Sequence, residues 1–491
     1  MTPTPQLGSF QGQGGGGLFR SDDGKSLFIT FALVTSLFLL WGFCNGMIDI
    51  LNKHFQDSLH INKEQSGLVQ FANYLAYFLM AIPAGLIARK FGYKGGIFVG
   101  LVLIAGGAFW FIHATGTGTY SAFLLGLFII AAGMTCLETI ANPYTTVLGA
   151  PESGATRINL AQTFNGVGWI LGPIVGGHFV FAGGDGANAH AGLSTPYLGI
   201  GIFAAVWVLV FVFAPVPDLH AADDRLKSAD LQKSVKPAGG RLAGIGIALA
   251  AVWGLLYLFI SPILRLVWAL LNLPPELLQP AKIGLLAAAY VASFIVVVRH
   301  WDMFRRKHFT LGVVTQFLYV AAQTGIFSFC VNYIMENDAS VTAPKASYWL
   351  GAIGFVLFMV GRACGSAVIS QFKPNLVLAA YAAINVVLTA VAIGGGKPGL
   401  VAMFGTFFFM SVMFPTIFAL GLRGLGDYTK LGSSLIVMSI VGGAIAPPFM
   451  GHIADVQSMR IGFVVPLVCF VFIALYGFFW PRLCKTDSEK P

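Results

Sequence analysis

Residues 27–51 read LFITFALVTSLFLLWGFCNGMIDIL, and this stretch decides the fold. A helix needs roughly 20 apolar residues to cross the hydrocarbon core of a bilayer, and this stretch has them with a single acid, Asp49, near its end. It is too long for the apolar part of a cleavable signal sequence. We therefore predict a helix that crosses a membrane and stays in the mature protein.

The composition of the whole chain agrees with this interpretation. Of the 491 residues, 56% are hydrophobic and only 10% are charged, whereas soluble domains average about 25% charged residues. We therefore expect lipid, not water, to surround most of the molecule. Apolar runs recur along the chain at 27–51, 65–88, 96–113, 120–148, 157–181, 196–215, 243–270, 281–298, 309–334, 347–370, 375–394, 398–421, 431–453 and 461–480.

These runs predict an all-α integral membrane protein with two six-helix bundles and two extra hydrophobic helices between them. A weak internal repeat supports the division, because Thr139-Ile140 in the first half matches Thr416-Ile417 in the second. The predicted segments are a disordered cytoplasmic N-terminus at 1–26, an N-terminal bundle at 27–215, a cytoplasmic linker with the extra helix pair at 216–308, a C-terminal bundle at 309–480 and a cytoplasmic tail at 481–491.

The basic residues predict the orientation in the membrane. They lie in short blocks between apolar runs, such as Arg89-Lys90 and Arg305-Arg306-Lys307, a pattern typical of loops at the cytoplasmic face and not of nucleic-acid binding. We predict a multi-pass protein of the bacterial inner membrane with both termini in the cytoplasm. Of the 29 Lys and Arg residues, this orientation leaves on the outer side only Lys53, Lys63, Arg265, Lys282, Lys345, Lys397 and Arg460.

No motif predicts an enzyme. The 6 cysteines lack metal-ligand or redox spacing, and neither an HExxH metal motif nor a nucleotide-binding loop occurs. We predict no metal, no cofactor and no catalytic residue. Two interpretations of another class stay open: an intramembrane enzyme with Asp49 and Glu138 as a catalytic pair, and a sugar sensor that does not transport.

Two carboxyl groups lie inside the predicted spans, whereas the other acidic residues lie in tails, loops or span ends. Asp49 is near the outer end of the first span, and Glu138 lies past the midplane of the fourth. Burying an ionised carboxylate in a membrane costs at least a few kcal/mol, so each group is a candidate for binding and releasing a proton. Their different depths favour a proton relay over a paired acid–base site.

Polar uncharged side chains accompany these acids. Asn142 follows Glu138 by four residues, on the same helical face, and amides both donate and accept hydrogen bonds, as the hydroxyl groups of a neutral sugar require. Arg362, in the eighth span, is a candidate gating residue. The candidate substrate-binding residues are Asn45, Glu138, Asn142, Gln162, Asn165, Tyr319, Gln323 and Asn332.

Several sequence blocks resemble the major facilitator superfamily, and more narrowly its fucose–galactose–glucose:proton symporters. The resemblance implies a two-bundle fold that works by alternating access. It also implies that Asp49 and Glu138 handle the coupled proton and that Asn142 and Gln162 face the sugar. The blocks are residues 128–133 (FIIAAG), 136–139 (CLET), 141–143 (ANP), 146–149 (TVLG), 159–165 (NLAQTFN), 319–320 (YV), 322–324 (AQT), 414–418 (FPTIF) and 432–434 (GSS).

Two departures from the family pattern affect the predicted substrate. Gly46 stands where fucose members have a second Asn, and Asn332 stands where they have a basic residue. We therefore expect a monomer that imports a hexose of the glucose or galactose type by proton symport. N-acetylglucosamine or L-fucose as the substrate, and sodium as the coupled ion, stay open. The extra pair at 243–298 lies outside the resemblance.

Overall fold

The structure is a computed structural model that describes residues 19, 26–148, 154–181, 191–214, 239–425 and 428–488. Nearly all of the predicted N-terminal segment, the linker from 216 to 238 and the end of the predicted tail lie outside these residues. Every regular element in the described ranges is a helix. The predicted all-α membrane fold is therefore confirmed.

The first helix group contains the first six predicted spans. The spans predicted at 65–88 and 96–113 appear as one long element, because the helix bends sharply at Gly92 without a loop. Gly92 has φ 70°, a conformation that glycine adopts without strain. The group comprises α1 (Phe28–Leu59), α2 (Lys63–Ser66), α3 (Leu68–Thr117), α4 (Tyr120–Val147), α5 (Gly154–Val180) and α6 (Ala191–Phe213).

The second helix group contains the last six predicted spans, four of which are interrupted. The span predicted at 347–370 contains a π-helix, η5 (Leu350–Phe355), before α12 begins. The group comprises α10 (Lys307–Asn337), α11 (Ala343–Trp349), η5, α12 (Val356–Gln371), α13 (Pro374–Gly394), α14 (Gly396–Met410), α15 (Met413–Leu422), α16 (Thr429–Met438), η7 (Ser439–Val441), α17 (Gly442–Val456), α18 (Met459–Gly462) and α19 (Val464–Ser488).

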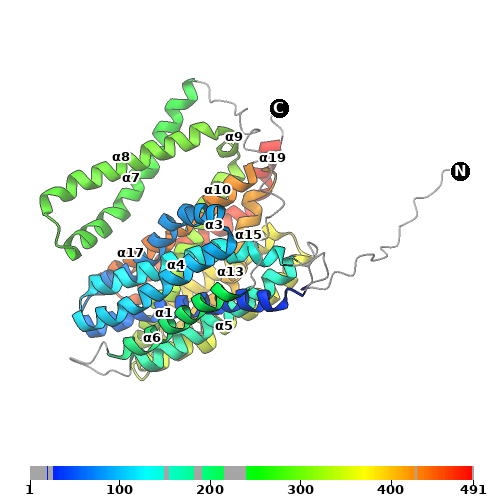
Figure 1. Cartoon of the computed structure of the whole chain (residues 1–491). Coiled ribbons are helices and arrows are strands. Elements are labelled where there is room, and N and C mark those ends of the chain that lie inside the picture. The colour runs from blue at the N-terminus through cyan, green and yellow to red at the C-terminus, as the bar shows by residue number, and fades with distance from the viewer. Residues whose placement is uncertain are drawn as a thin grey trace.

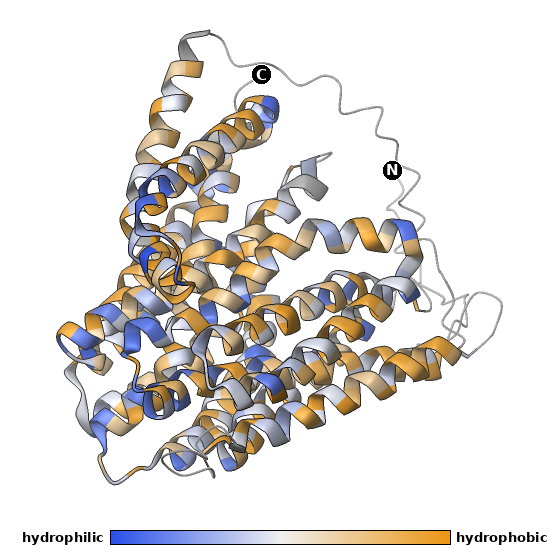
Figure 2. Ribbon diagram, turned by 60° about the vertical axis from the view of Figure 1, so that its left-hand side comes forward, coloured by the Kyte–Doolittle hydropathy of each residue, from blue (hydrophilic) through white to orange (hydrophobic). Residues whose placement is uncertain are grey.

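The extra pair of helices forms a hairpin that stands apart from the two groups (Figure 1). It consists of α7 (Gly239–Leu270), η4 (Pro275–Leu277) and α8 (Leu278–Arg299), followed by the short α9 (Trp301–Phe304). The hairpin meets the bundle where α7 contacts α17. Among the described residues, 11 helices are long and apolar enough to cross a membrane, or up to 12 if the bent pair Leu242–Leu258 and Ile260–Leu270 is one span. Figure 2 shows how hydrophobic residues dominate these helices.

Glycines let α1 and α5 cross within the first group at very short range. A Cβ atom on Gly172 would lie 2.7 Å from the carbonyl carbon of Gly46. A Cβ atom on Gly46 would lie 2.8 Å from the carbonyl oxygen of Trp169. Small residues are what allow helix backbones to approach closely in lipid. The two helices therefore form one interlocked unit.

The two groups touch at the end of the bundle where α1 ends and α2 lies, which we call the closed end. The backbone N–H groups of Lys63 and Glu64 donate to the two carboxylate oxygens of Asp455 in α17, at 3.0 and 2.8 Å. His452 of α17 lies 2.8 Å from the Glu64 carboxylate. Deeper in the seam, Asn52 Nδ2 donates to the carbonyl oxygen of Ser328 at 3.3 Å.

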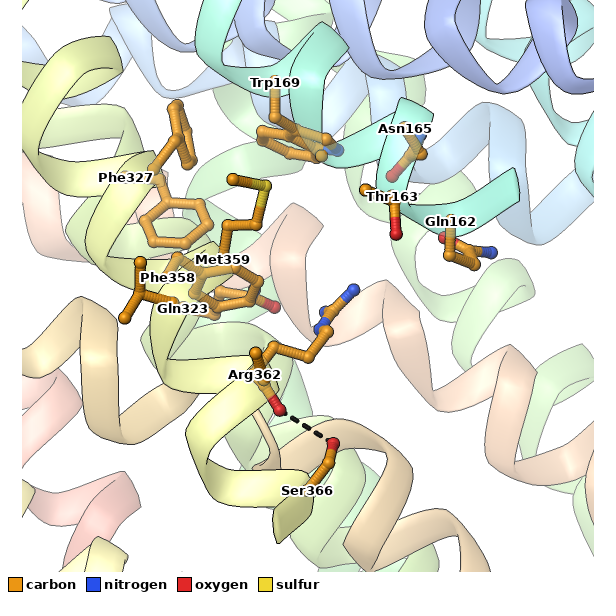
Figure 3. A pocket seen from close by; sticks show the side chains of 14 residues that line it. Gln162, Thr163, Asn165, Trp169, Gln323, Phe327, Phe358, Met359, Arg362 and Ser366 are labelled. Carbon is orange, nitrogen blue, oxygen red and sulfur yellow. Dashed lines mark hydrogen bonds between the residues drawn. The ribbon is translucent and has the colours of Figure 1, made fainter. Parts of the chain in front are cut away.

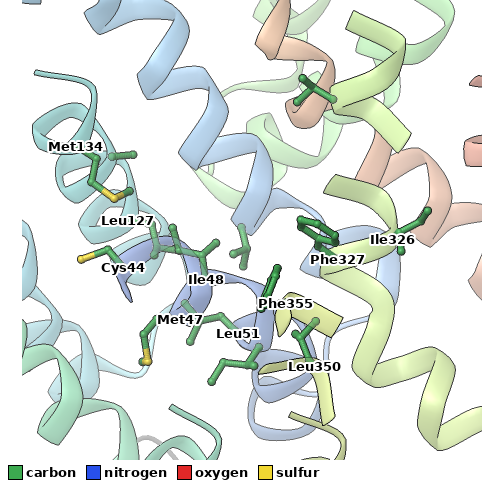
Figure 4. Close-up of a cluster of buried hydrophobic side chains, with 14 of the residues drawn as sticks. Cys44, Met47, Ile48, Leu51, Leu127, Met134, Ile326, Phe327, Leu350 and Phe355 are labelled. Atoms are coloured by element: carbon green, nitrogen blue, oxygen red, sulfur yellow. The ribbon is translucent and has the colours of Figure 1, made fainter. Parts of the chain in front are cut away.

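Apolar packing continues this closure towards the middle of the bundle. Ile48 and Leu51 of α1 belong to the same buried cluster as Leu350 and Phe355 of the second group (Figure 4). A Cβ atom on Gly67 would lie 2.7 Å from the Cα atom of Pro448 in α17, so the two groups are in direct contact there. The opposite end, where α1 begins and α19 ends, is called the termini end below.

Asp455→Asn should loosen the closed end. The carboxylate accepts from two backbone donors at the start of α2, and the amide has only one acceptor atom. Because Asp455 is exposed, we expect a shift of about 1 kcal/mol, or roughly fivefold, towards separation of the two groups. The readout is maleimide labelling of Ser328→Cys, at a site only 1% exposed, with labelling of the native cysteines subtracted.

The matched control is Asp57→Asn. Asp57 lies at the same end but pairs with Lys53 of its own helix, at 2.6 Å, so its loss should leave the labelling rate unchanged. Equal labelling rates in the Asp455 variant and the parent, or an equal rise in the control, would show that this contact does not hold the groups together.

Candidate functional site

A cavity of about 530 Å³ lies between the two helix groups, where α5 faces α10 and α12 (Figure 3). Pockets for small ligands typically measure about 300–1,000 Å³, so this cavity has the size of a small-molecule site. Four of the residues predicted from the sequence line it, two from each helix group. These are Gln162 and Asn165 of α5, Gln323 of α10 and Arg362 of α12.

Aromatic rings form the floor of the cavity on the side of the closed end. The centroid of Phe355 lies 5.1 Å from that of Trp169 and 5.0 Å from that of Phe327, and the Trp169 and Phe327 centroids are 6.0 Å apart. Trp169 belongs to the first group and the two phenylalanines to the second, so the floor spans the seam. These three rings were not among the residues predicted from the sequence. The signal for Trp169 was present, since it follows Asn165 by four residues and Gln162 by seven, on one helical face.

Amides line the polar part of the cavity in α5. Gln162 Nε2 donates to Asn142 Oδ1 of α4 at 3.1 Å, and this bond ties Asn142 to the cavity although Asn142 is not in its lining. Asn165 is buried and its Nδ2 donates to the carbonyl oxygen of Phe38 in α1 at 3.1 Å. Both amides are thus oriented by neighbouring helices of the first group, and Gln162 presents donor and acceptor atoms close to the cavity.

Arg362 brings a positive charge to the cavity. Its Nε donates to the carbonyl oxygen of Ser411 at 3.3 Å, and its guanidinium carbon lies 5.0 Å from the centre of the Phe358 ring. A guanidinium over an aromatic face is stabilised by the electron density of the ring. The second helix group alone therefore positions Arg362.

Asp49 is only 3% exposed and lies on the seam, outside the cavity lining. Gln70 Nε2 of α3 donates to its Oδ1 at 2.9 Å. The other oxygen, Oδ2, is buried with no hydrogen-bond partner. A buried ionised carboxylate ordinarily requires several donors, so this environment suits a carboxyl group that holds a proton.

Glu138 lines a second, small hollow within the first group. Its other lining residues are apolar apart from the indole of Trp41. Glu138 is partly buried and does not line the main cavity. Trp41, which lines the hollow with Glu138, precedes Asp49 by eight residues on α1. Trp41 and Asp49 are therefore about 12 Å apart along the axis of α1. The two acids thus occupy separate sites at different depths, Asp49 fully buried and Glu138 partly buried.

Besides Glu138 and Asn142, three other predicted substrate-binding residues do not line the cavity, and they bond to protein atoms. Asn45 Nδ2 donates to the carbonyl oxygen of Trp41 at 3.0 Å. The Tyr319 hydroxyl donates to the carbonyl oxygen of Met410, also at 3.0 Å. Asn332 Nδ2 donates to Gln56 Oε1 at 2.5 Å, across the closed end. Contact of these three residues with a substrate stays a prediction for other conformations.

Gly46 has a packing role in this structure. Besides the contact with Trp169, its Cβ atom would lie 2.9 Å from Pro173 Cδ. An asparagine side chain at this position would therefore collide with α5. The close crossing of α1 and α5 therefore explains why this chain has Gly46 where the family pattern has Asn. There is no room at this position for a side chain that could bind a substrate.

Comparisons with known proteins agree with this architecture. The profile of the Major Facilitator Superfamily matches residues 27–439. The L-fucose-proton symporter of Escherichia coli is 37% identical over 93% of this chain and 94% of its own length. A glucose/galactose transporter of Brucella abortus is 30% identical over 91% and 93%.

A solved structure has the same fold. The Major Facilitator Superfamily transporter FucP, crystallised in the outward conformation, superimposes with a TM-score of 0.57 at 33% identity, over 92% of this chain and 98% of that one. The family resemblance predicted from the sequence blocks is confirmed, and it identifies a multi-pass transporter and not an enzyme. The chain belongs to the Major Facilitator Superfamily.

Proposed function

We propose that this chain imports a neutral hexose of the glucose or galactose type together with a proton, by alternating access. The observation that carries the proposal is a cavity on the seam between the two helix groups that is lined by amides and aromatic rings, together with two carboxyl groups inside the helix bundle, the buried Asp49 and the partly buried Glu138. The names of the relatives support the substrate class, since they are a fucose–proton symporter and a glucose/galactose transporter.

The lining of the cavity suits a sugar. The amides of Gln162, Asn165 and Gln323 offer both donors and acceptors for hydroxyl groups. The rings of Trp169 and Phe358 offer apolar faces for the C–H groups of a pyranose. A sugar held there would contact both helix groups, so its binding would depend on their relative position.

The closed end supports alternating access. In this structure the groups meet through Asp455, Asn52 and the aromatic floor, whereas the related FucP was crystallised in the outward conformation. We propose that the bundles at 27–215 and 309–480 move as units and that the termini end is cytoplasmic. Arg362, which the second group holds near the cavity, is the proposed gating residue on that side. We further propose a monomer in the bacterial inner membrane.

Asp49→Asn should abolish accumulation of sugar driven by a pH gradient and retain sugar exchange. The amide preserves the shape of the side chain and a partner for Gln70 but cannot bind and release a proton. The assay is uptake of labelled glucose, galactose, N-acetylglucosamine and fucose into vesicles at two pH values, without sodium, with and without a protonophore. Glu138→Gln should impair sugar binding as well as accumulation.

Asp57→Asn, an exposed acid of the same helix, is the control and should accumulate sugar normally. If Asp49→Asn still concentrates any of the four sugars against a gradient, the proposed coupling role is wrong. Accumulation that requires sodium and ignores the protonophore would replace the proton with sodium as the coupled ion.

Gln162→Leu and Gln323→Leu should each weaken sugar binding by about five- to thirtyfold, the effect of losing about 1–2 kcal/mol of hydrogen bonding. Equilibrium binding of the transported sugar to the purified protein measures this. Gln316→Leu is the control, because Gln316 lies on α10 outside the cavity lining and its buried amide has no partner. Equal losses in all three variants would indicate a general packing defect and not a sugar contact.

A further inference from the structure

Three polar residues of α3 lie on one helical face between the two acids Asp49 and Glu138. Gln70, Tyr74 and Tyr77 are spaced by four and three residues, so their side chains follow one another along the helix. Gln70 donates to Asp49 Oδ1 at 2.9 Å. The Tyr77 hydroxyl, two turns further on, accepts from Trp41 Nε1 at 2.8 Å.

One end of this row contacts Asp49 directly, and the other end lies near Glu138 through Trp41. At one end, Gln70 contacts Asp49, whose Oδ2 is buried without a partner. At the other end, the Trp41 that bonds to Tyr77 lines the same small hollow as Glu138. Tyr74 lies within electrostatic reach of both carboxyl groups. The tyrosine hydroxyl groups are therefore placed along the way from one acid to the other.

The hydroxyl hydrogen of each tyrosine is the one that proton transfer would use. In the contacts with Trp41 and Thr324 each hydroxyl oxygen is the acceptor, so its own O–H is not used in those bonds. A hydroxyl group can accept a proton on its oxygen and release its own in the same event. Tyr74 and Tyr77 then end with the protons with which they began, while one acid loses a proton and the other gains it.

Tyr74 also joins the row to the second helix group. Thr324 Oγ1 of α10 donates to the Tyr74 hydroxyl at 3.1 Å. A Cβ atom on Gly443 of α17 would lie 2.7 Å from the Tyr74 ring and 2.8 Å from Thr324 Oγ1, so three helices enclose this bond. When the two groups separate at this level, Tyr74 must lose Thr324 and can take another partner.

We propose that Tyr74 and Tyr77 form a proton path between Asp49, which Gln70 orients, and Glu138, directly or through water, and that the Thr324–Tyr74 bond closes this path while the two groups are in contact. The inference rests on the proposed function, in which these two acids carry the coupled proton. It adds the residues that connect them and a reason why proton movement follows the movement of the groups.

Tyr74→Phe and Tyr77→Phe test the path, because each removes one hydroxyl and keeps the ring. Loss of a proton-transferring group typically slows the transfer about 10²–10⁴-fold. In reconstituted vesicles we expect sugar-induced proton uptake and pH-driven accumulation to fall at least about tenfold. Sugar counterflow, which needs no net proton movement, should stay within about twofold of the parent, since the cavity lining is unchanged.

Tyr333→Phe is the matched control. This buried tyrosine donates to the carbonyl oxygen of Ala392 at 2.6 Å, entirely within the second group, so the variant should retain both activities. A tyrosine with only a packing role would lower counterflow and accumulation together. That outcome in Tyr74→Phe and Tyr77→Phe, or normal accumulation in both, would overturn the path.

Thr324→Val tests the closing contact separately. The valine keeps the shape of the threonine and removes its donor, which leaves Tyr74 without Thr324. We expect proton leakage across the vesicle membrane in the absence of sugar, and an unchanged leak would overturn the role of this bond. If Asp49→Asn abolishes accumulation while the tyrosine variants retain it, the path is wrong and the proposed function stands. If Asp49→Asn accumulates sugar, the proposed function itself fails.

Discussion

The rest of this structure depends on how the Asp49 carboxyl group is stabilised inside an apolar helix bundle. Asp49 lies where helices of both groups meet, with one donor and one oxygen that has no partner. Water does not stabilise a charge there, and removing a carboxylate from water costs several kcal/mol even after the protein relaxes. The group is stable as long as it can hold a proton or find a new partner. Its surroundings are therefore tied to the arrangement of the helices.

Close helix contacts occur both within the first group and between the two groups. Within the first group, α1 and α5 are in close contact at glycines, and a side chain on Gly46 or Gly172 would collide with the other helix. Between the groups, the closed end has close glycine contacts of the same kind, such as Gly67 against Pro448, together with single hydrogen bonds, the contact of His452 with the Glu64 carboxylate, and aromatic edges. Each of these hydrogen bonds typically contributes about 1 kcal/mol. The seam thus combines close backbone packing with polar contacts that are individually weak.

The sequence predicted the helices well and the site in part. Runs of apolar residues locate spans directly, and isolated polar residues within them pointed to Gln162, Asn165, Gln323 and Arg362, which meet at one cavity. The aromatic floor escaped prediction because a phenylalanine in a membrane helix has the same pattern whether it faces lipid or a cavity. Asn332 was expected at the substrate and bonds instead to Gln56. Which helix lies opposite a given face is a property of the packing, and one sequence does not contain it in readable form.

The π-helix at Leu350–Phe355 has a consequence for the wall of the cavity. A π turn contains more residues than an α turn, and such segments are confined to short stretches because they pack less favourably. If η5 became an α-helix, its register would change by about one residue. The side chains of α12 that follow it would then turn by roughly 100° around the helix axis. Phe358 and Arg362 would swing out of the wall together, and other side chains would replace them. The six residues of the π-helix therefore determine which side chains of α12 face the cavity.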